Sequence, residues 1–161
     1  MYTREENEAR FAQLLDRYDQ DHRQAGHRRL LALCLPLLLW SAIALVWTIP
    51  VPPGIGRPGL WSVGLQVLLF TWYWKHSRRL GLAMFIVMLA LSLLTYTIDI
   101  DIAPSRLRSI ATVTLLAGGF GVLAGRLLER PPLGLRDALA GLFVGPAWLL
   151  DRLLQRIGLG S

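Results

Sequence analysis

The chain has 161 residues, of which 53% are hydrophobic and only 17% charged, with a net charge of +6 and one cysteine. Soluble domains average about 45–50% apolar and about 25% charged residues, so this composition argues against an ordinary soluble domain. One cysteine excludes an intrachain disulfide. The arginines cluster at the ends of apolar runs, which fits an anionic membrane surface better than a nucleic-acid groove.

The first predicted element is an amphipathic helix over residues 2–29, within an N-terminal segment of residues 1–29. Its start has the spacing of a capping box. Apolar side chains then follow at helical spacing, and these are Phe11, Leu14, Leu15 and Tyr18. The other faces carry charges of both signs. We expect a cytosolic helix that lies on the membrane or packs on a helical bundle.

Four apolar runs predict membrane-spanning helices, over residues 30–49, 60–74, 80–98 and 109–125. The first and third contain no charged residue. The second is short and ends in three aromatic residues, as expected at a membrane interface. Residues 30–125 are therefore predicted to form a four-helix transmembrane bundle, which makes the chain an all-α, polytopic membrane protein.

Small residues recur at every fourth position of the fourth run, at Ala117, Gly121 and Gly125. Such a stripe lets two helix backbones approach closely. Packing within the chain is the favoured interpretation. A homodimer through Gly121 and Gly125 is the alternative.

Residues 126–161 are predicted to form a cytosolic or interfacial C-terminal segment. The apolar run over residues 139–150 is too short to span as a helix, and Gly145-Pro146 is expected to break it. We interpret this run as a re-entrant or interfacial segment that continues into an amphipathic end. A fifth, distorted span is the alternative.

The distribution of Lys and Arg predicts the orientation. Fourteen of the 17 lie in the N-terminal segment, in the link between the second and third runs, or after the fourth run. Both termini are therefore expected in the cytoplasm. A composition rich in arginine, leucine, alanine and glycine suggests a bacterial source, and hence the inner membrane.

The three histidines, His22, His27 and His76, lie on one membrane face in this topology. Histidine is the commonest metal ligand, and with carboxylates it can hold iron. His22 and His27 are separated by about 140° on a continuous helix, so both can face one metal only if the helix breaks at Ala25-Gly26. The alternative is that the histidines lie near lipid headgroups without a metal.

Other chemistry has little support. Motifs for a nucleophile elbow, a phosphate loop, HExxH or CxxC are absent from the sequence. The predicted spans hold no carboxylate, which argues against a proton-coupled transporter.

The segment that leads into the first span has the spacing Y-x3-H-x4-N-x3-H-x2-G-x-P, and its positions are filled here by Tyr18, His22, His27, Leu31, Cys34 and Pro36. This spacing resembles the opening motif of small integral-membrane 2-hydroxy fatty acid (2-hydroxypalmitate) dioxygenases of fatty-acid α-oxidation. The motif Asn is replaced by His27, the second motif His by Leu31 and the Gly by Cys34.

The likeness continues along the chain. Residues 73–84 are similar to the family's link between its second and third spans, and residues 121–125 to the end of its fourth, where Gly125 replaces a histidine. Glu129 and Pro132 follow, with Glu129 about one residue out of register. Residues 145–151 match the family's closing motif in outline.

The resemblance implies Fe(II)-dependent oxidative shortening of a 2-hydroxy acyl chain. His22 is the one aligned motif histidine retained, and one histidine cannot hold iron in the usual arrangement of two histidines and one carboxylate. The implied replacements are His27 and His76, with a carboxylate from Asp19, Glu129 or Asp151. A substrate carboxylate would meet Arg23, Arg28 or Arg29 while its acyl tail enters the bundle. The alternatives are a degenerate, non-catalytic relative that binds lipid or a partner protein, and an unrelated small membrane protein.

Overall fold

The computed structural model describes residues 4–21, 25–127 and 135–156, with side chains at 6–18, 20, 30–124 and 144–156. These residues form helices and no strand, so the predicted all-α class is confirmed. The helices are α1 (Arg4–Asp21), α2 (Ala25–Trp47), α3 (Leu60–His76), α4 (Arg78–Asp101), α5 (Pro104–Leu127) and α6 (Leu135–Arg156).

Three of the described helices are long and apolar enough to cross a membrane: α2 over Leu30–Trp47, α4 over Arg78–Asp101 and α5 over Pro104–Ala124. α3 has 17 residues, or about 26 Å of helix at about 1.5 Å per residue. That length is at the lower limit for a span. The chain thus has the helices of a membrane protein, and three of the four predicted spans reach the length and hydropathy of one.

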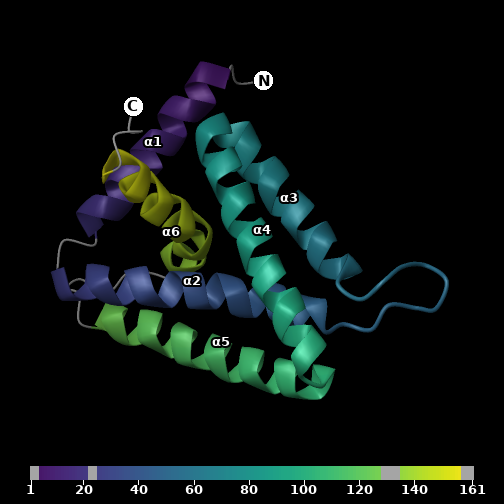
Figure 1. Cartoon of the computed structure of the whole chain (residues 1–161). Helices are drawn as coiled ribbons and strands as arrows, with labels where there is room; N and C mark the ends of the chain where they lie inside the picture. Colours follow the sequence, from purple (N-terminus) through teal and green to yellow (C-terminus); the bar gives the residue numbers. More distant parts are fainter. Residues whose placement is uncertain (1–3, 22–24, 128–134, 157–161) are drawn as a thin grey trace.

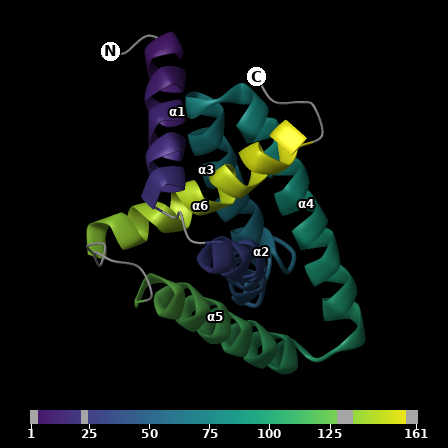
Figure 2. The same cartoon turned by 90° about the vertical axis from the view of Figure 1, so that its left-hand side faces the viewer.

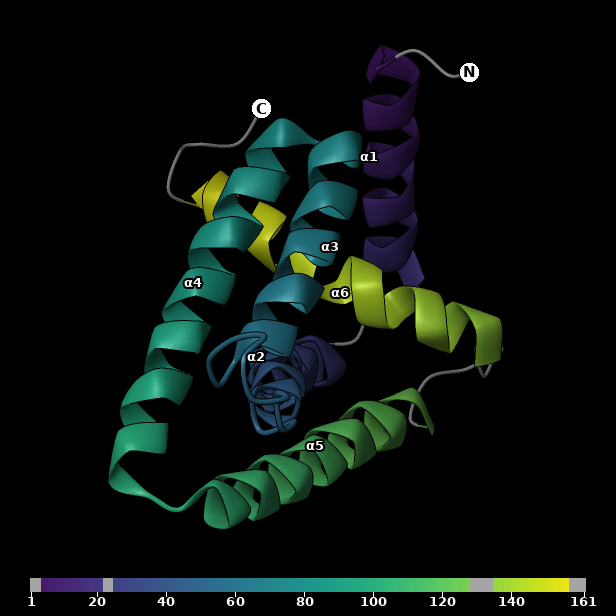
Figure 3. The ribbon, with the colours of Figure 1, turned by 90° about the vertical axis from the view of Figure 1, so that its right-hand side faces the viewer.

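Figure 1 shows two antiparallel helix pairs, α2 beside α5 and α3 beside α4. The pairs meet near the α2–α3 loop and the α4–α5 turn, and they diverge toward the other end (Figure 3). α1 and α6 occupy the space between the diverging ends, where α6 contacts α1, α2 and α4 (Figure 2). We call the end where the pairs diverge around α1 and α6 the wide end of the bundle. The end with the α2–α3 loop and the α4–α5 turn is the narrow end.

Hydrogen bonds hold the narrow end together. The Trp47 indole Nε1 donates to Asp99 Oδ2 at 3.2 Å, which joins α2 to α4. Arg108 Nη2 donates to the carbonyl oxygen of Thr48 at 2.7 Å, which joins α5 to the end of α2. Gly59, with φ +88°, lies so close to the Trp47 ring that a Cβ would come within 2.8 Å of it. These contacts therefore join α2, α4 and α5 at the narrow end.

Small residues let α5 approach α2 closely. Leu107 and Ala111 are fully buried against α2. A Cβ on Gly118 would lie 3.1 Å from Leu38, and one on Gly121 would lie 2.6 Å from Cys34 Sγ. The prediction that Gly121 packs within the chain is confirmed. The predicted stripe is wrong at Ala117, which is exposed, because the contact line follows alternating steps of four and three residues.

The N-terminal part of the chain differs from prediction in its boundaries. The expected single helix over residues 2–29 is two helices, since α1 ends at Asp21 and α2 begins at Ala25. Ala25-Gly26 therefore starts α2 instead of breaking a helix. The first apolar run shares α2 with residues 25–29, because Ala25, Arg28 and Arg29 are good helix formers and a helix need not stop where its hydropathy changes.

The C-terminal apolar run also differs from prediction. α6 is continuous through Gly145-Pro146, where a break was expected. Gly145 is a position of close approach instead, because a Cβ there would lie 3.0 Å from Leu35 and 3.1 Å from the Tyr18 hydroxyl. α6 therefore passes close to both α2 and α1 at the wide end.

Candidate functional site

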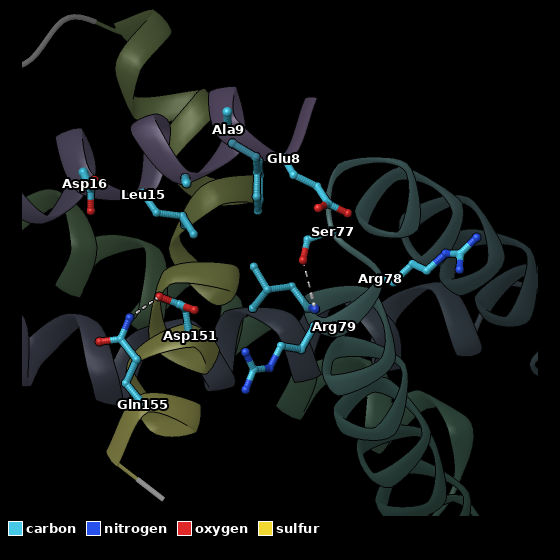
Figure 4. Close-up of a pocket in the computed structure, with 12 residues that line it drawn as sticks. Glu8, Ala9, Leu15, Asp16, Ser77, Arg78, Arg79, Asp151 and Gln155 are labelled. Carbon is cyan, nitrogen blue, oxygen red and sulfur yellow. Dashed lines mark hydrogen bonds between the residues drawn. The ribbon is translucent and has the colours of Figure 1, made fainter. Parts of the chain in front are cut away.

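A polar pocket of about 660 Å³ opens at the wide end between α1, the α3–α4 junction and α6 (Figure 4). Its apolar side is formed by Phe11, Leu15 and Leu80. Its polar side chains come from all three elements, and they are Glu8 and Asp16 of α1, Ser77, Arg78 and Arg79 of the junction, and Asp151 and Gln155 of α6.

The sharp α3–α4 junction places two arginines at this pocket. Ser77 has extended backbone (φ −159°) and caps α4, since its hydroxyl accepts a hydrogen bond from Leu80 N at 3.5 Å. α4 therefore begins directly after α3, and Arg78 and Arg79 fall in its first turn. The Arg78 guanidinium also lies 5.7 Å from the centre of the Trp74 ring.

Asp151 is a partly buried carboxylate in the pocket wall. Gln155 Nε2 donates to Asp151 Oδ2 at 2.7 Å, within one turn of α6 (Figure 4). Burial raises the pKa of the Asp151 carboxyl above its usual value, and the nearby charge of Asp16 raises it further. The Arg79 guanidinium and the hydrogen bond from Gln155 act in the opposite direction and do not cancel the effect of burial.

An apolar cavity of about 240 Å³ lies deeper in the bundle. Leu35, Leu38, Leu39 and Ala42 of α2 form one wall, and the others are Leu65, Leu69 and Tyr73 of α3, Met84 of α4, Leu115 of α5 and Pro146 of α6. Every lining residue except Tyr73 is aliphatic or a thioether, so the cavity suits a hydrocarbon chain.

The polar pocket and the apolar cavity lie one helical turn apart on the same face of α4. Leu80 lines the pocket, and Met84, four residues later, lines the cavity. Residues at this spacing are neighbours on a helix surface. Both side chains are buried in the main core together with Tyr73. The two spaces are therefore stacked along the bundle, with the polar one at its wide end.

Of the predicted histidines, only His76 has a described side chain. Its Nδ1 lies 2.7 Å from the carbonyl oxygen of Trp72, so Nδ1 carries a hydrogen and donates it. The ring packs 4.4 Å from the Trp72 ring and 5.3 Å from the Phe11 ring, measured between centroids. His22 lies outside the described residues, and His27 lies in the first turn of α2 with no described side chain.

The predicted arginines and carboxylates are only partly described. Arg23 and Glu129 lie outside the described residues, and the side chains of Asp19, Arg28 and Arg29 are not described either. Gly125 is described only as part of the α5 backbone. Asp151 is the one predicted carboxylate ligand with a described side chain, and it faces the polar pocket.

The described residues alone do not fit an iron centre. No three His, Cys, Asp or Glu side chains among them lie together as metal ligands. A centre that combined His76 with His22 and His27 stays a prediction, because two of its three side chains are outside that description.

The polar pocket itself was not predicted from the sequence. Arg79 counted toward the topology only as a positive charge, and Asp16 had no assigned role. A usable signal was present in Asp151, which is the one carboxylate in the amphipathic run over residues 139–157. Nothing local indicated that α1 and α6 would bring two carboxylates to the first turn of α4.

Comparisons with models of protein families, with curated proteins and with solved structures find no match to this chain. The class follows from the fold alone. The described chain is a bundle of helices with three apolar enough to cross a membrane, as in an integral membrane protein.

Proposed function

We propose that the chain spans the inner membrane four times, with α3 as the additional span and both termini in the cytoplasm. α3 supports this role because its outer side chains Val63, Val67 and Leu68 are exposed and apolar. The wide end, which carries α1 and the basic α3–α4 junction, then faces the cytoplasm, where positively charged segments are enriched. α6 lies across this end as an interfacial helix.

We propose that this protein binds a fatty acyl lipid at the cytoplasmic side of the membrane. The observation that carries the proposal is the stacking of a polar pocket with two arginines on an apolar cavity between five helices. A bilayer surrounds such a cavity with acyl chains, and its lining offers them only apolar contacts apart from Tyr73. The Arg79 guanidinium can hold an anionic group at the end of that chain.

Filling the cavity tests this proposal. Ala42 lines the cavity, so Ala42→Phe places a ring where the acyl chain would lie. We expect native mass spectrometry of the detergent-purified protein to show about ten-fold weaker binding of palmitate and of dioleoyl phospholipids, corresponding to about 1.4 kcal/mol. Ala90→Phe is the control, because Ala90 is exposed on α4. Equal lipid binding by the wild type and by a folded Ala42→Phe variant would refute the proposal.

A second candidate is an iron-dependent enzyme acting on 2-hydroxy fatty acids. It is favoured by His76, because metal-bound histidines commonly donate their second ring N–H to a backbone carbonyl, as His76 does to Trp72. Nε2 then keeps the lone pair that a metal needs. A capping role near the end of α3 is the structural alternative for the same hydrogen bond.

Iron content separates the catalytic form from a non-catalytic one. Protein expressed with iron and purified anaerobically should contain Fe(II) if the enzyme interpretation holds. His22→Ala should then abolish the iron content, and His27→Ala and His76→Ala should lower it. Iron-free wild-type protein that still binds acyl lipid would identify a non-catalytic lipid-binding protein.

A further inference from the structure

We propose that the polar pocket binds a zwitterionic headgroup that joins a phosphate ester to a primary ammonium group, as in a phosphatidylethanolamine. This inference rests on the proposed acyl-lipid function and specifies the class of lipid. It concerns the side chains of α1, α4 and α6 shown in Figure 4.

The pocket presents both signs of charge. Arg78 and Arg79 stand on the α4 side, whereas Asp16 and Asp151 come from α1 and α6 (Figure 4). Glu8 adds a third carboxylate near the α3–α4 junction. A simple anion would gain from the arginines but would be repelled by the carboxylates, and a simple cation would meet the opposite problem. A ligand carrying both charges can satisfy both walls.

The first turn of α4 suits the phosphate. Backbone N–H groups at a helix start lack partners within the helix and attract anions. In this turn Leu80 N is already capped by the Ser77 hydroxyl. The same turn carries Arg79, whose guanidinium can bind phosphate oxygens through paired hydrogen bonds, whereas the Arg78 guanidinium lies over the Trp74 ring and points away from the pocket (Figure 4). No hydrogen bond joins the Arg79 guanidinium to another described residue, although its charge acts on the Asp151 carboxyl.

The carboxylates opposite suit the ammonium group. Asp16 also makes no hydrogen bond or ion pair to another described residue. Asp151 has one oxygen held by Gln155 and lies close enough to Asp16 for their charges to interact. Bringing two carboxylates together is unfavourable unless a cation lies between them. An ammonium group with three N–H donors can bridge both.

The size and position of the pocket are also suitable. Its volume of about 660 Å³ is within the range of about 300–1,000 Å³ seen for small-molecule sites. The apolar cavity begins one turn of α4 below it, so a headgroup bound here would have its acyl chains at the depth of Met84. A headgroup and one of its chains would thus occupy adjoining spaces.

The experiment compares lipids that share dioleoyl chains and differ in headgroup. Native mass spectrometry of the full-length protein in detergent would measure binding of dioleoyl phosphatidylethanolamine, phosphatidylcholine and phosphatidylglycerol. We expect about ten-fold preference for phosphatidylethanolamine over phosphatidylglycerol, which lacks the amine. Phosphatidylcholine should bind at an intermediate level, because its methylated amine keeps the charge but loses the N–H donors.

Variants assign each charge to its partner. Asp151→Asn and Asp16→Asn should reduce phosphatidylethanolamine binding to the phosphatidylglycerol level, whereas Arg79→Gln should weaken both lipids. Asp151→Glu and Arg79→Lys should restore part of the binding. The control variants Asp101→Asn and Arg106→Gln change exposed charges at the narrow end and should leave the preference unchanged. Each variant should retain the thermal stability and gel-filtration profile of a folded protein.

A soluble source of the same chemistry is tested with phosphoethanolamine. The proposal expects it to bind far more weakly than the lipid, since it lacks the acyl chains. Equal affinity would assign the pocket to a soluble phosphate ester and overturn the lipid assignment. Equal binding of all three lipids, unaffected by Asp151→Asn and Arg79→Gln, would overturn the headgroup inference while leaving acyl-lipid binding intact. Failure of every lipid to bind would instead refute the proposed function.

Discussion

Two kinds of residue stand out at the wide end: glycines that allow close helix contacts, and a carboxylate whose burial disfavours its charged form. Gly121 and Gly145 allow helices to approach within contact distance of Cys34 and Leu35. Asp151 sits partly buried beside a second carboxylate, where its charged form is disfavoured. The glycine contacts and the partly buried carboxylate both lead to measurable predictions, because a single substitution changes either one contact or one charge.

Gly121→Leu is expected to destabilise the α2–α5 contact. A Cβ at this position would already come within 2.6 Å of Cys34 Sγ, and overpacking a close contact typically costs about 1–3 kcal/mol. Thermal unfolding in detergent should therefore shift to lower temperature. Gly119→Leu is the control two residues earlier, where a Cβ meets nothing within 4 Å. Equal stability of the two variants would show that α5 does not pack on α2 as described.

Asp151→Asn is predicted to change how stability depends on pH. The folded pKa of Asp151 is raised, so the folded state holds this proton more tightly than the unfolded state does. The resulting stabilisation is fully present below the ordinary value of about 3.9, and it is lost as pH rises through the raised folded pKa. Asp16, Arg79 and Gln155 are the neighbours that set this shift.

The measurement is thermal unfolding of the two proteins across the acidic to neutral range. Asp151→Asn should be at least as stable as wild type at neutral pH, because it removes a partly buried charge. The fall in wild-type stability over that window should be smaller in the variant. A variant that is less stable than wild type at neutral pH would indicate that Asp151 is held as a stabilising carboxylate.

Hydropathy predicted the apolar helices well but their boundaries poorly. The apolar runs in α2, α4 and α5 were evident, because uninterrupted hydrophobicity is a strong signal. The start of α2 at Ala25 and the continuation of α6 through Pro146 were not evident. Tertiary contacts decide whether a helix continues past a glycine or a proline. Gly145 looks like a breaker in the sequence, whereas in the fold its missing side chain makes room for Leu35 and Tyr18.

α1 is expected to depend on one aromatic contact for its position on the bundle. Phe11 is 2% exposed and packs edge-on against Trp72 of α3. Replacing a buried Phe by Ala typically costs about 3–5 kcal/mol. Phe11→Ala should therefore release α1, which limited proteolysis of the detergent-solubilised protein would detect as faster cleavage before residue 25. Leu14→Ala, at a side chain 47% exposed, should leave the cleavage rate unchanged, and equal rates for both variants would contradict this packing.

At the scale of the whole molecule, the bundle is narrow at one end and wide at the other. The sequence predicted a membrane protein, which the three apolar helices support. That one membrane face gathers the histidines and most of the basic residues stays a prediction. The sequence could not predict the polar pocket, because Asp16, Arg79 and Asp151 are far apart in the chain. They line one pocket only because α1 and α6 fill the space between the diverging helix pairs. The same limit applies to the apolar cavity, whose walls come from five helices.

The proposed orientation predicts opposite locations for the two ends of the bundle. In a Cys34→Ala background, Gly56→Cys at the narrow end should react with a membrane-impermeant maleimide added to the outside of intact spheroplasts. Arg156→Cys at the end of α6 should react only after the membrane is opened. The reverse pattern would overturn the orientation, and labelling of both from outside would overturn the even number of spans.

The most direct test of acyl-lipid binding is photo-crosslinking with a phosphatidylethanolamine that carries a diazirine in one acyl chain. The protein would be reconstituted in bilayers, irradiated, and its labelled peptides identified by mass spectrometry. The account predicts saturable labelling at the cavity residues, such as Leu38, Leu69 and Met84, that is reduced by unlabelled lipid and by Ala42→Phe. Labelling confined to outward-facing residues such as Phe85 and Leu116, and unaffected by competitor or by Ala42→Phe, would contradict it.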